Sequence, residues 1–166
     1  MRSGKIPAML FCSWCVGFVP VNDLKKADMK KVEFDQEIHT FDIDFAGHVS
    51  NIVYVRWMEI GRLKLLAAAG LPVERVVDEL GLFPTLIATE IRYRKQLFLG
   101  DRVTVHVWLS KLKHVSAIME FRFFNQYGDL AAEGRQTGLF IDARSHKPTP
   151  LSEEAHQRFV AFLDQG

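Results

Sequence analysis

The chain has 166 residues, which corresponds to one domain at about 150 residues per domain. Its composition is 48% hydrophobic and 25% charged, close to the globular average, so extended disorder, collagen and coiled coil are disfavoured. With 21 Lys and Arg against 20 Asp and Glu, the net charge of +1 creates no overall field that attracts nucleic acid or an anionic membrane. We therefore expect neither as a partner, and any anionic ligand must be held by a local site.

The N-terminal segment differs in composition from the rest. Residues 6–21 are almost entirely apolar and follow two basic residues, as in a signal peptide. The run is shorter than the roughly 20 residues of a membrane helix, is interrupted by proline and glycine, and lacks a clear cleavage site. The preferred interpretation is an N-terminal extension over residues 1–28 before a domain over residues 29–166, with targeting or anchoring as the alternative.

Cys12 and Cys15 are the two cysteines, too few for a disulfide framework. This favours a reducing compartment and predicts a cytoplasmic protein. Their C-x-x-C spacing also fits a redox pair or half of a zinc site, but no second C-x-x-C follows. The six histidines show no metal-ligand spacing such as H-E-x-x-H. We expect no metal and no cofactor.

The hydrophobic pattern of residues 32–69 predicts one strand and one long helix. Residues 32–39 alternate between apolar and polar, which is typical of a strand with one buried face. A loop over residues 40–50 follows. Residues 51–69 form the helix, with Ser50 as its N-cap and Gly70 just past its end. Apolar residues surround nearly the whole helix, so we expect it to be buried on most sides.

The second half of the chain is predicted to consist mainly of strands. A short helix over residues 73–80 precedes a strand over residues 85–97, and a turn follows at 99–101. Alternating patterns and turn signals then predict three further strands. The first covers residues 102–109, the second runs from residue 115 to a turn at 127–129, and the third covers residues 130–142. A helix from about residue 152 ends the predicted domain.

Consecutive strands joined by short turns form antiparallel hairpins, and the long apolar helix needs a sheet to cover it. The sequence therefore predicts an α+β architecture, with a curved antiparallel sheet around a central helix. An exposed strand edge favours a partner, so we expect a homodimer or a homotetramer.

Residues 39–54 (HTFDIDFAGHVSNIVY) carry the most specific motif. With Trp57, Glu59 and Arg62, they resemble the D-x-D-x-x-G-H-V-x-N-x-x-Y pattern of hot-dog-fold acyl-CoA thioesterases of the 4-hydroxybenzoyl-CoA thioesterase family. The similarity extends over roughly Lys31 to Leu163. It implies a hot-dog fold and a hydrolase that converts an acyl-CoA, or an acyl carrier protein thioester, to a free carboxylic acid and the thiol.

The spacing of this motif also has a chemical reason. Thioester hydrolysis needs a nucleophile or an activated water, and hydrogen-bond donors where the oxyanion develops. Asp44 lies six residues before Ser50, so a tight loop, with Gly47 allowing the turn, could bring its carboxylate near the unpaired amides of the helix start. The competing interpretation is that Asp44, like Asp42, only stabilises a turn.

The resemblance implies a catalytic role for Asp44, as nucleophile or as general base. For the substrate-binding set it adds Gly47, His48, Asn51 and Tyr54, with the backbone N–H near Asn51 polarising the thioester carbonyl. The family often has Asn where this chain has Ser50, so no side-chain role is assigned there.

Glu59 is a rival carboxylate, because a helix acid is catalytic in other hot-dog branches. Arg56 and Arg62 lie three residues to either side of it, which favours an ion pair, and we include Glu59 among the residues that line the substrate site. Two clusters of basic residues could hold the CoA phosphates. The first consists of Arg92, Arg94 and Lys95, and the second of Lys111, Lys113 and His114. Each cluster fits a solvated strand edge equally well.

Two other functions share the predicted fold. The first is a non-catalytic module that binds acyl thioesters, in which Asp44 is structural. The second is a dehydratase acting on hydroxyacyl thioesters, which ranks last because no histidine-bearing hydratase motif is present. Fold alone does not decide between these functions.

Overall fold

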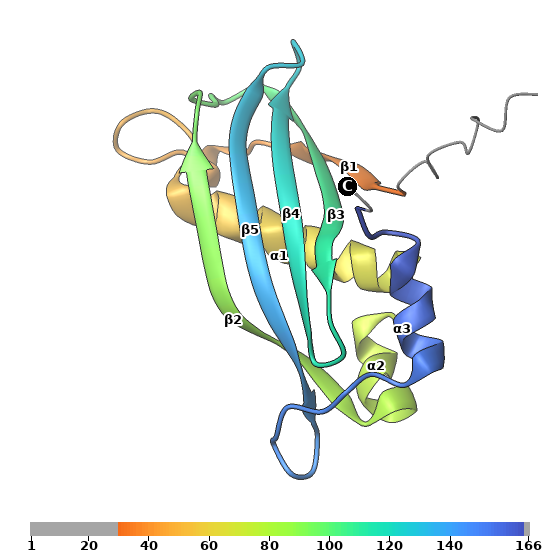
Figure 1. The fold of residues 1–166 in the computed structure, drawn as a ribbon. Helices are drawn as coiled ribbons and strands as arrows, with labels where there is room; N and C mark the ends of the chain where they lie inside the picture. The colour runs from red at the N-terminus through yellow and green to blue at the C-terminus, as the bar shows by residue number, and fades with distance from the viewer. Residues whose placement is uncertain (1–29, 165–166) are drawn as a thin grey trace, which may run out of the picture.

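The computed structural model describes residues 30–164, which form a five-stranded antiparallel sheet and three α-helices (Figure 1). The N-terminal apolar run and the two cysteines lie outside the described residues. The elements in chain order are β1 (Val32–Glu37), a 3₁₀ turn (Thr40–Asp42), α1 (Asn51–Ala68), α2 (Val73–Leu80), β2 (Leu82–Tyr93), β3 (Arg102–Leu112), β4 (Ser116–Asn125), β5 (Leu130–Asp142) and α3 (Glu153–Val160).

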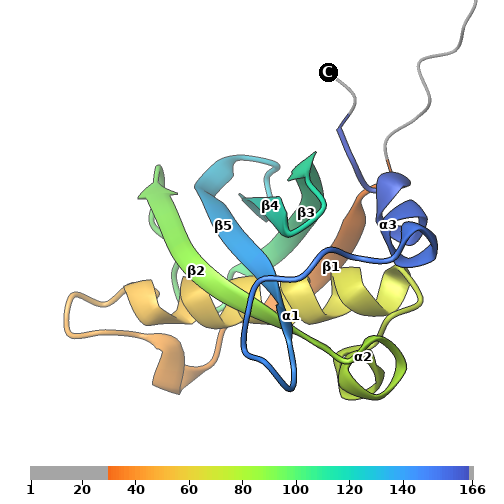
Figure 2. The same ribbon diagram turned by 60° about the horizontal axis from the view of Figure 1, so that its bottom comes forward.

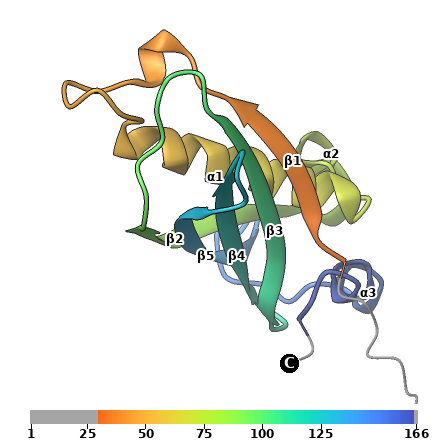
Figure 3. The ribbon, with the colours of Figure 1, turned by 90° about the horizontal axis from the view of Figure 1, so that it is seen from above.

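The strands are ordered β1-β3-β4-β5-β2 across the sheet, and every neighbouring pair is antiparallel. The sheet curves around α1, which lies across one of its faces (Figure 2, Figure 3). This is the hot-dog arrangement that the sequence predicts. The two edges of the sheet are β1 and β2. None of the described helices is long and apolar enough to cross a membrane.

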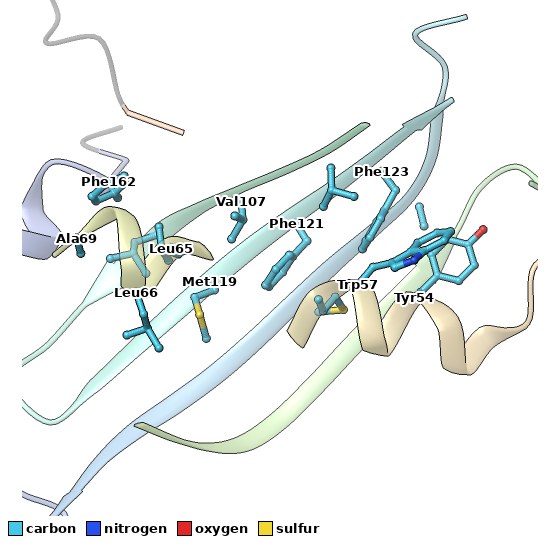
Figure 4. Close-up of a cluster of buried hydrophobic side chains, with 14 of the residues drawn as sticks. Tyr54, Trp57, Leu65, Leu66, Ala69, Val107, Met119, Phe121, Phe123 and Phe162 are labelled. Atoms are coloured by element: carbon cyan, nitrogen blue, oxygen red, sulfur yellow. The ribbon is translucent and has the colours of Figure 1, made fainter. Parts of the chain in front are cut away.

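The core lies between α1 and the inner face of the sheet (Figure 4). The alternating valines of β3 all point into it, as their period of two predicts. On α1 the first two turns present Tyr54 and Trp57 to Phe123 of β4, while the later turns present Leu65 and Leu66 near Met119. The inner face of the sheet therefore holds α1 by apolar contact along its whole length.

Two glycines let α1 lie close to the sheet. A Cβ atom on Gly61 of α1 would come within 2.9 Å of the Phe121 ring, and one on Gly134 of β5 within 2.8 Å of the Met58 methyl group. Real Cβ atoms essentially never approach other atoms that closely. Small residues at these two positions therefore set the distance between helix and sheet.

The expectation that α1 is buried on most sides is wrong for the described chain. Ile52 is exposed, and Ile60 and Leu63 are only half-buried, although all three are apolar. A single sheet can cover one side of a helix, and α2 lies only beside its C-terminal part (Figure 2). The outward side of α1 thus keeps apolar side chains at the surface.

Most predicted boundaries agree with the structure, and β2 is the main exception. It was predicted over residues 85–97 but runs from Leu82 to Tyr93. Beyond Tyr93 the chain leaves the sheet because the N–H groups of Arg94 and Lys95 both donate to the carbonyl of Ala131. Residues 94–97 then cross to the loop before α1, which matters for the site.

Candidate active site

A tight turn ends the loop between β1 and α1. The N–H of Asp44 donates to the carbonyl oxygen of His48 at 2.9 Å, and the N–H of Gly47 donates to that of Asp44 at 3.0 Å. Gly47 has a φ of +81°, in the left-handed region where glycine is favoured. A bridge between Ile43 and Val49 joins the two arms. The turn that the sequence predicts at Gly47 is therefore present.

Asp42 anchors the loop from inside. Its side chain is only 5% exposed, and its Oδ2 accepts a hydrogen bond from the N–H of His39 at 2.9 Å. Its carbonyl accepts from the N–H of Ser50, and the N–H of Val49 donates to the carbonyl of Leu97, both at 2.9 Å. Asp42 thus has the structural role that the sequence allowed for either aspartate.

Asp44 divides its two carboxylate oxygens between the turn and a histidine. Oδ1 accepts a hydrogen bond from the N–H of Ala46 at 2.8 Å, while Oδ2 lies 3.7 Å from Nδ1 of His48. The side chains of Asp44 and His48 are 24% and 25% exposed. One oxygen therefore stabilises the turn, and the other faces an imidazole at a partly open surface.

The start of α1 offers unpaired hydrogen-bond donors. Ser50 occupies the N-cap position, as predicted, but its side chain makes no capping hydrogen bond. The N–H of Val53 donates to the carbonyl of Ser50 at 3.0 Å, whereas the N–H groups of Asn51 and Ile52 have no acceptor within residues 30–164. These two donors lie at the positive end of the helix dipole.

An open hollow of about 230 Å³ lies beside this helix start. His48, Asn51 and Tyr54 line one side, and residues 93–97 line the other. The Tyr93 hydroxyl donates to the carbonyl of Asn51 at 3.5 Å, and the ring of Tyr54 packs edge-on against that of Tyr93. The structure therefore brings three of the predicted residues together, with Asp44 joined to the hollow through His48.

The basic residues beside the hollow are already paired. Nε of Arg94 donates to Glu133 at 3.1 Å, and Nζ of Lys95 lies 2.8 Å from Asp129. These contacts hold the pKa of each carboxyl below its usual value, with a hydrogen bond as the main cause in both. A phosphate that binds here has to compete with two carboxylates. The second predicted cluster, Lys111, Lys113 and His114, lies at the opposite end of the sheet, in the β3–β4 hairpin (Figure 1).

Glu59 forms an ion pair with Arg62. Both of its oxygens accept hydrogen bonds from that guanidinium, one from Nε at 3.1 Å, and the remaining nitrogen of Arg62 donates to the carbonyl of Pro84 at 2.8 Å. The pair connects α1 to β2. Arg56, the other flanking arginine, forms no ion pair or hydrogen bond with Glu59 among the described residues. Glu59 does not line the hollow beside His48.

Sequence reasoning missed the wall formed by residues 93–97. Tyr93 was placed inside a strand, and nothing in its local pattern links it to Asn51, which precedes it by more than 40 residues. The link arises from the pairing of β2 with β5 and from the turn of the chain at Arg94. Antiparallel register of this kind depends on the whole sheet.

Comparisons with known proteins point to one family. Residues 38–159 match a family model described as the thioesterase-like superfamily. A Bacillus subtilis (strain 168) relative named "Putative acyl-CoA thioesterase YneP" is 25% identical over 112 residues, which cover 68% of this chain and 80% of that protein. The 1,4-dihydroxy-2-naphthoyl-CoA hydrolase of Thermosynechococcus vestitus is 22% identical over 121 residues, or 73% of this chain and 83% of that one.

Solved structures show the same fold. The structure of a DHNA-CoA thioesterase from Staphylococcus aureus superposes with a TM-score of 0.72 at 21% identity, covering 78% of this chain and 89% of the other. At this level of identity the likeness establishes the arrangement of the sheet around its helix.

Proposed function

The chain belongs to the thioesterase-like superfamily, and from this premise we propose that it hydrolyses an acyl-CoA thioester to a free carboxylic acid and CoA, with Asp44 as the catalytic carboxylate. The observation that carries the proposal is the turn that holds Asp44 beside His48, directly before a helix start with two unpaired donors. The relatives named above act by name on an acyl-CoA and on a dihydroxynaphthoyl-CoA, which supports CoA as the thiol.

The carboxylate acts in one of two ways. As a nucleophile, Oδ2 of Asp44 attacks the thioester carbon, the C–S bond breaks and the CoA thiolate leaves, and water hydrolyses the resulting anhydride. As a general base, the same oxygen takes a proton from a water molecule that attacks the carbon, the C–S bond then breaks, and the departing CoA thiolate takes up that proton. The imidazole of His48 faces Oδ2 in either case, with Nδ1 3.7 Å from that oxygen and 3.4 Å from the carbonyl oxygen of Val49.

The helix start supplies the complementary charge. The N–H groups of Asn51 and Ile52 have no acceptor in the described chain, so they are free to donate to the oxygen that becomes negative during attack. The carbonyl of Asn51 is held by Tyr93, which fixes the backbone at that point. A capping hydrogen bond to the Ser50 side chain would occupy the N–H of Ile52 or Val53, so its absence leaves the N–H of Ile52 available together with that of Asn51.

We also propose that the chain acts as a homodimer joined through β2. The two edges of the sheet differ: β1 is short and exposes acidic side chains, whereas β2 is twice as long and exposes Phe83, Ile87 and Tyr93. Long apolar edges pair with other strands unless something blocks them. Tyr93 also lines the hollow, so a partner on this edge would lie beside the active site. The cytoplasmic location stays a prediction from the cysteine content.

The test is thiol release from a panel of acyl-CoAs by the wild-type protein and by Asp44→Asn. Asparagine keeps an oxygen that can accept from the N–H of Ala46, so the turn and the fold are retained. We expect the rate constant kcat to fall roughly a hundredfold or more. Asp35→Asn is the matched control, because Asp35 is an exposed carboxylate on β1 that pairs with Thr104.

Three results would contradict the proposal. Full activity in a folded Asp44→Asn variant removes Asp44 from the chemistry. If Glu59→Gln loses activity and Asp44→Asn retains activity, Glu59 on the helix is the catalytic carboxylate. Binding of acyl-CoA without turnover by the wild type favours the acyl-thioester-binding module.

A further inference from the structure

An apolar groove lies on the outward side of α1, beside the start of α2. Its volume is about 280 Å³, and five of its lining side chains are apolar: Ile60, Leu63, Ala67, Pro72 and Val73. Two charged residues, Lys64 and Glu74, complete the lining. The groove shares no lining residue with the active-site hollow, so it is a separate feature of the surface.

The described chain leaves the apolar side chains of this groove partly open to solvent. Ala67 and Val73 are exposed, and Ile60 and Leu63 are half-buried. The sheet packs against the opposite side of α1 and contributes no residue to the groove (Figure 2). A contiguous apolar surface bordered by charged residues is typical of a place where another segment or molecule packs.

A segment of matching composition precedes the described residues. Residues 6–21 contain no charged side chain, and their largest side chains are those of Phe11, Trp14 and Phe18. Large apolar side chains gain free energy when they leave water, so this run favours contact with an apolar surface. It lies outside residues 38–159, which match the family model, so membership of the family does not account for it.

The groove is within reach of this run. The described chain begins at Lys30, whose N–H donates to the carbonyl of Ala161 at 3.2 Å, and β1 starts near α3 (Figure 3). Four residues later, or about 13 Å along the strand, the ring of Phe34 lies 5.3 Å from Nζ of Lys64 in the groove. The connecting residues 22–29 can span up to roughly 26 Å, so they are long enough to lead the run to the groove.

We propose that residues 6–21 pack in this groove of their own chain, with Phe11, Trp14 and Phe18 against the outward side of α1. Covalent attachment favours this occupant over a second copy of the chain, because a short tether holds the run near the groove at an effective concentration of about 1 mM. A second copy reaches such a concentration only in a very concentrated solution. The packed run covers apolar side chains of α1 and α2 that the sheet leaves open.

The test uses the full chain and its own cysteines, which both lie in this run. Cys15→Ser leaves Cys12 as the only native thiol, and Lys64→Cys adds a second thiol in the groove. The fraction of intramolecular disulfide in a glutathione buffer gives the effective concentration of Cys12 at position 64.

Lys111→Cys is the matched control. Lys111 is also an exposed lysine, and it follows Trp108, whose ring lies 5.4 Å from Nζ of Lys31, by three residues on β3. Positions 64 and 111 are therefore about equally far from the point where the run joins the described chain, but position 111 does not line the groove. We expect an effective concentration at least roughly tenfold higher at position 64 than at position 111.

Two further changes test whether the contact is apolar. Trp14→Asp in the run and Leu63→Asp in the groove each place a charge in the contact, so each should lower the value at position 64 to that at position 111. Trp14→Asp leaves residues 30–164 unaltered, which separates loss of the contact from damage to the groove. Equal values at positions 64 and 111 overturn the proposal, as does a value at position 64 that Trp14→Asp does not lower. A disulfide formed mainly between two chains also overturns it, because another copy then occupies the groove.

Discussion

At the scale of single residues, the two aspartates of the motif have different environments. Asp42 is buried and its carboxylate accepts from the backbone, so its charge stabilises the loop. Asp44 is partly open and directs one oxygen to His48. The sequence places both in the same D-x-D pattern, and the fold of the loop gives them these different environments. The two carboxylates therefore differ in exposure and in what each oxygen contacts.

Tyr54 provides a prediction at this scale. Burial, and secondly the nearby Tyr93, raise the pKa of Tyr54 above the usual value of about 10. Because the folded-state pKa is the higher one, the protein is fully stabilised below about pH 10 and loses stability as the pH rises. At about pH 11 the free energy of unfolding should have fallen by about 1.4 kcal/mol from this group alone.

Urea denaturation of wild type and Tyr54→Phe across this pH range checks the prediction. The alkaline loss should be smaller in Tyr54→Phe, and the last step of tyrosinate absorbance should disappear. Tyr127→Phe, at an exposed turn, serves as the control and should keep the wild-type pH dependence of stability. Identical alkaline loss in wild type and Tyr54→Phe would show that Tyr54 ionises as readily in the folded chain as in the unfolded one.

At the scale of elements, the contact of α1 with the sheet depends on Gly61. The Phe121 ring next to it is fully buried and cannot move aside, whereas the atoms next to Gly134 belong to the flexible end of Met58. We expect Gly61→Ala to destabilise the protein by about 1–3 kcal/mol despite the higher helix propensity of alanine. Gly134→Ala should cost less.

Thermal and urea denaturation of the two alanine variants tests this difference. The comparison is internal, because both changes add one methyl group to the same helix–sheet interface. If Gly61→Ala proves as stable as the wild type, the spacing between helix and sheet is looser than the contacts indicate. A greater loss in Gly134→Ala than in Gly61→Ala would likewise contradict the assignment of Phe121 as the rigid neighbour.

At the scale of the whole molecule, the difference between the two sheet edges predicts how copies assemble. Ile87 is 59% exposed and lies where the pairing of β2 with β5 is irregular, close to the middle of the strand. An aspartate there would place a charge at the centre of a β2–β2 interface. We expect the wild type to be a dimer by light scattering after size exclusion, and Ile87→Asp to be a folded monomer.

Tyr127→Asp is the matched control, since it adds the same charge to an exposed aromatic turn residue away from both edges. It should remain dimeric. A monomeric wild type would refute the proposed assembly outright. A dimer that persists in Ile87→Asp would move the interface to another surface, of which the apolar outward side of α1 is the first to examine.

Much of this protein is determined by its sequence. The alternating valines predict strand β3. Gly70 and Gly81, after which the helical spacing of apolar residues stops, predict the ends of the two helices. These signals act between residues that are close in the chain. The motif over residues 39–54 is equally local, so its turn and the start of α1 could be predicted. Such features need no knowledge of what packs against them.

Only the tertiary structure decided the surroundings of these elements. Three features depend on strand register and on how closely α1 approaches the sheet: the wall of residues 93–97, the hydrogen bond from Arg62 to the carbonyl of Pro84, and the buried amide oxygen of Gln136, which is unpaired within the described residues. These contacts join residues far apart in the chain, and their free energy depends on the whole sheet forming at once. Local sequence patterns do not encode such long-range contacts, which is why the loop that holds Asp44 could be predicted from the sequence and the wall opposite it could not.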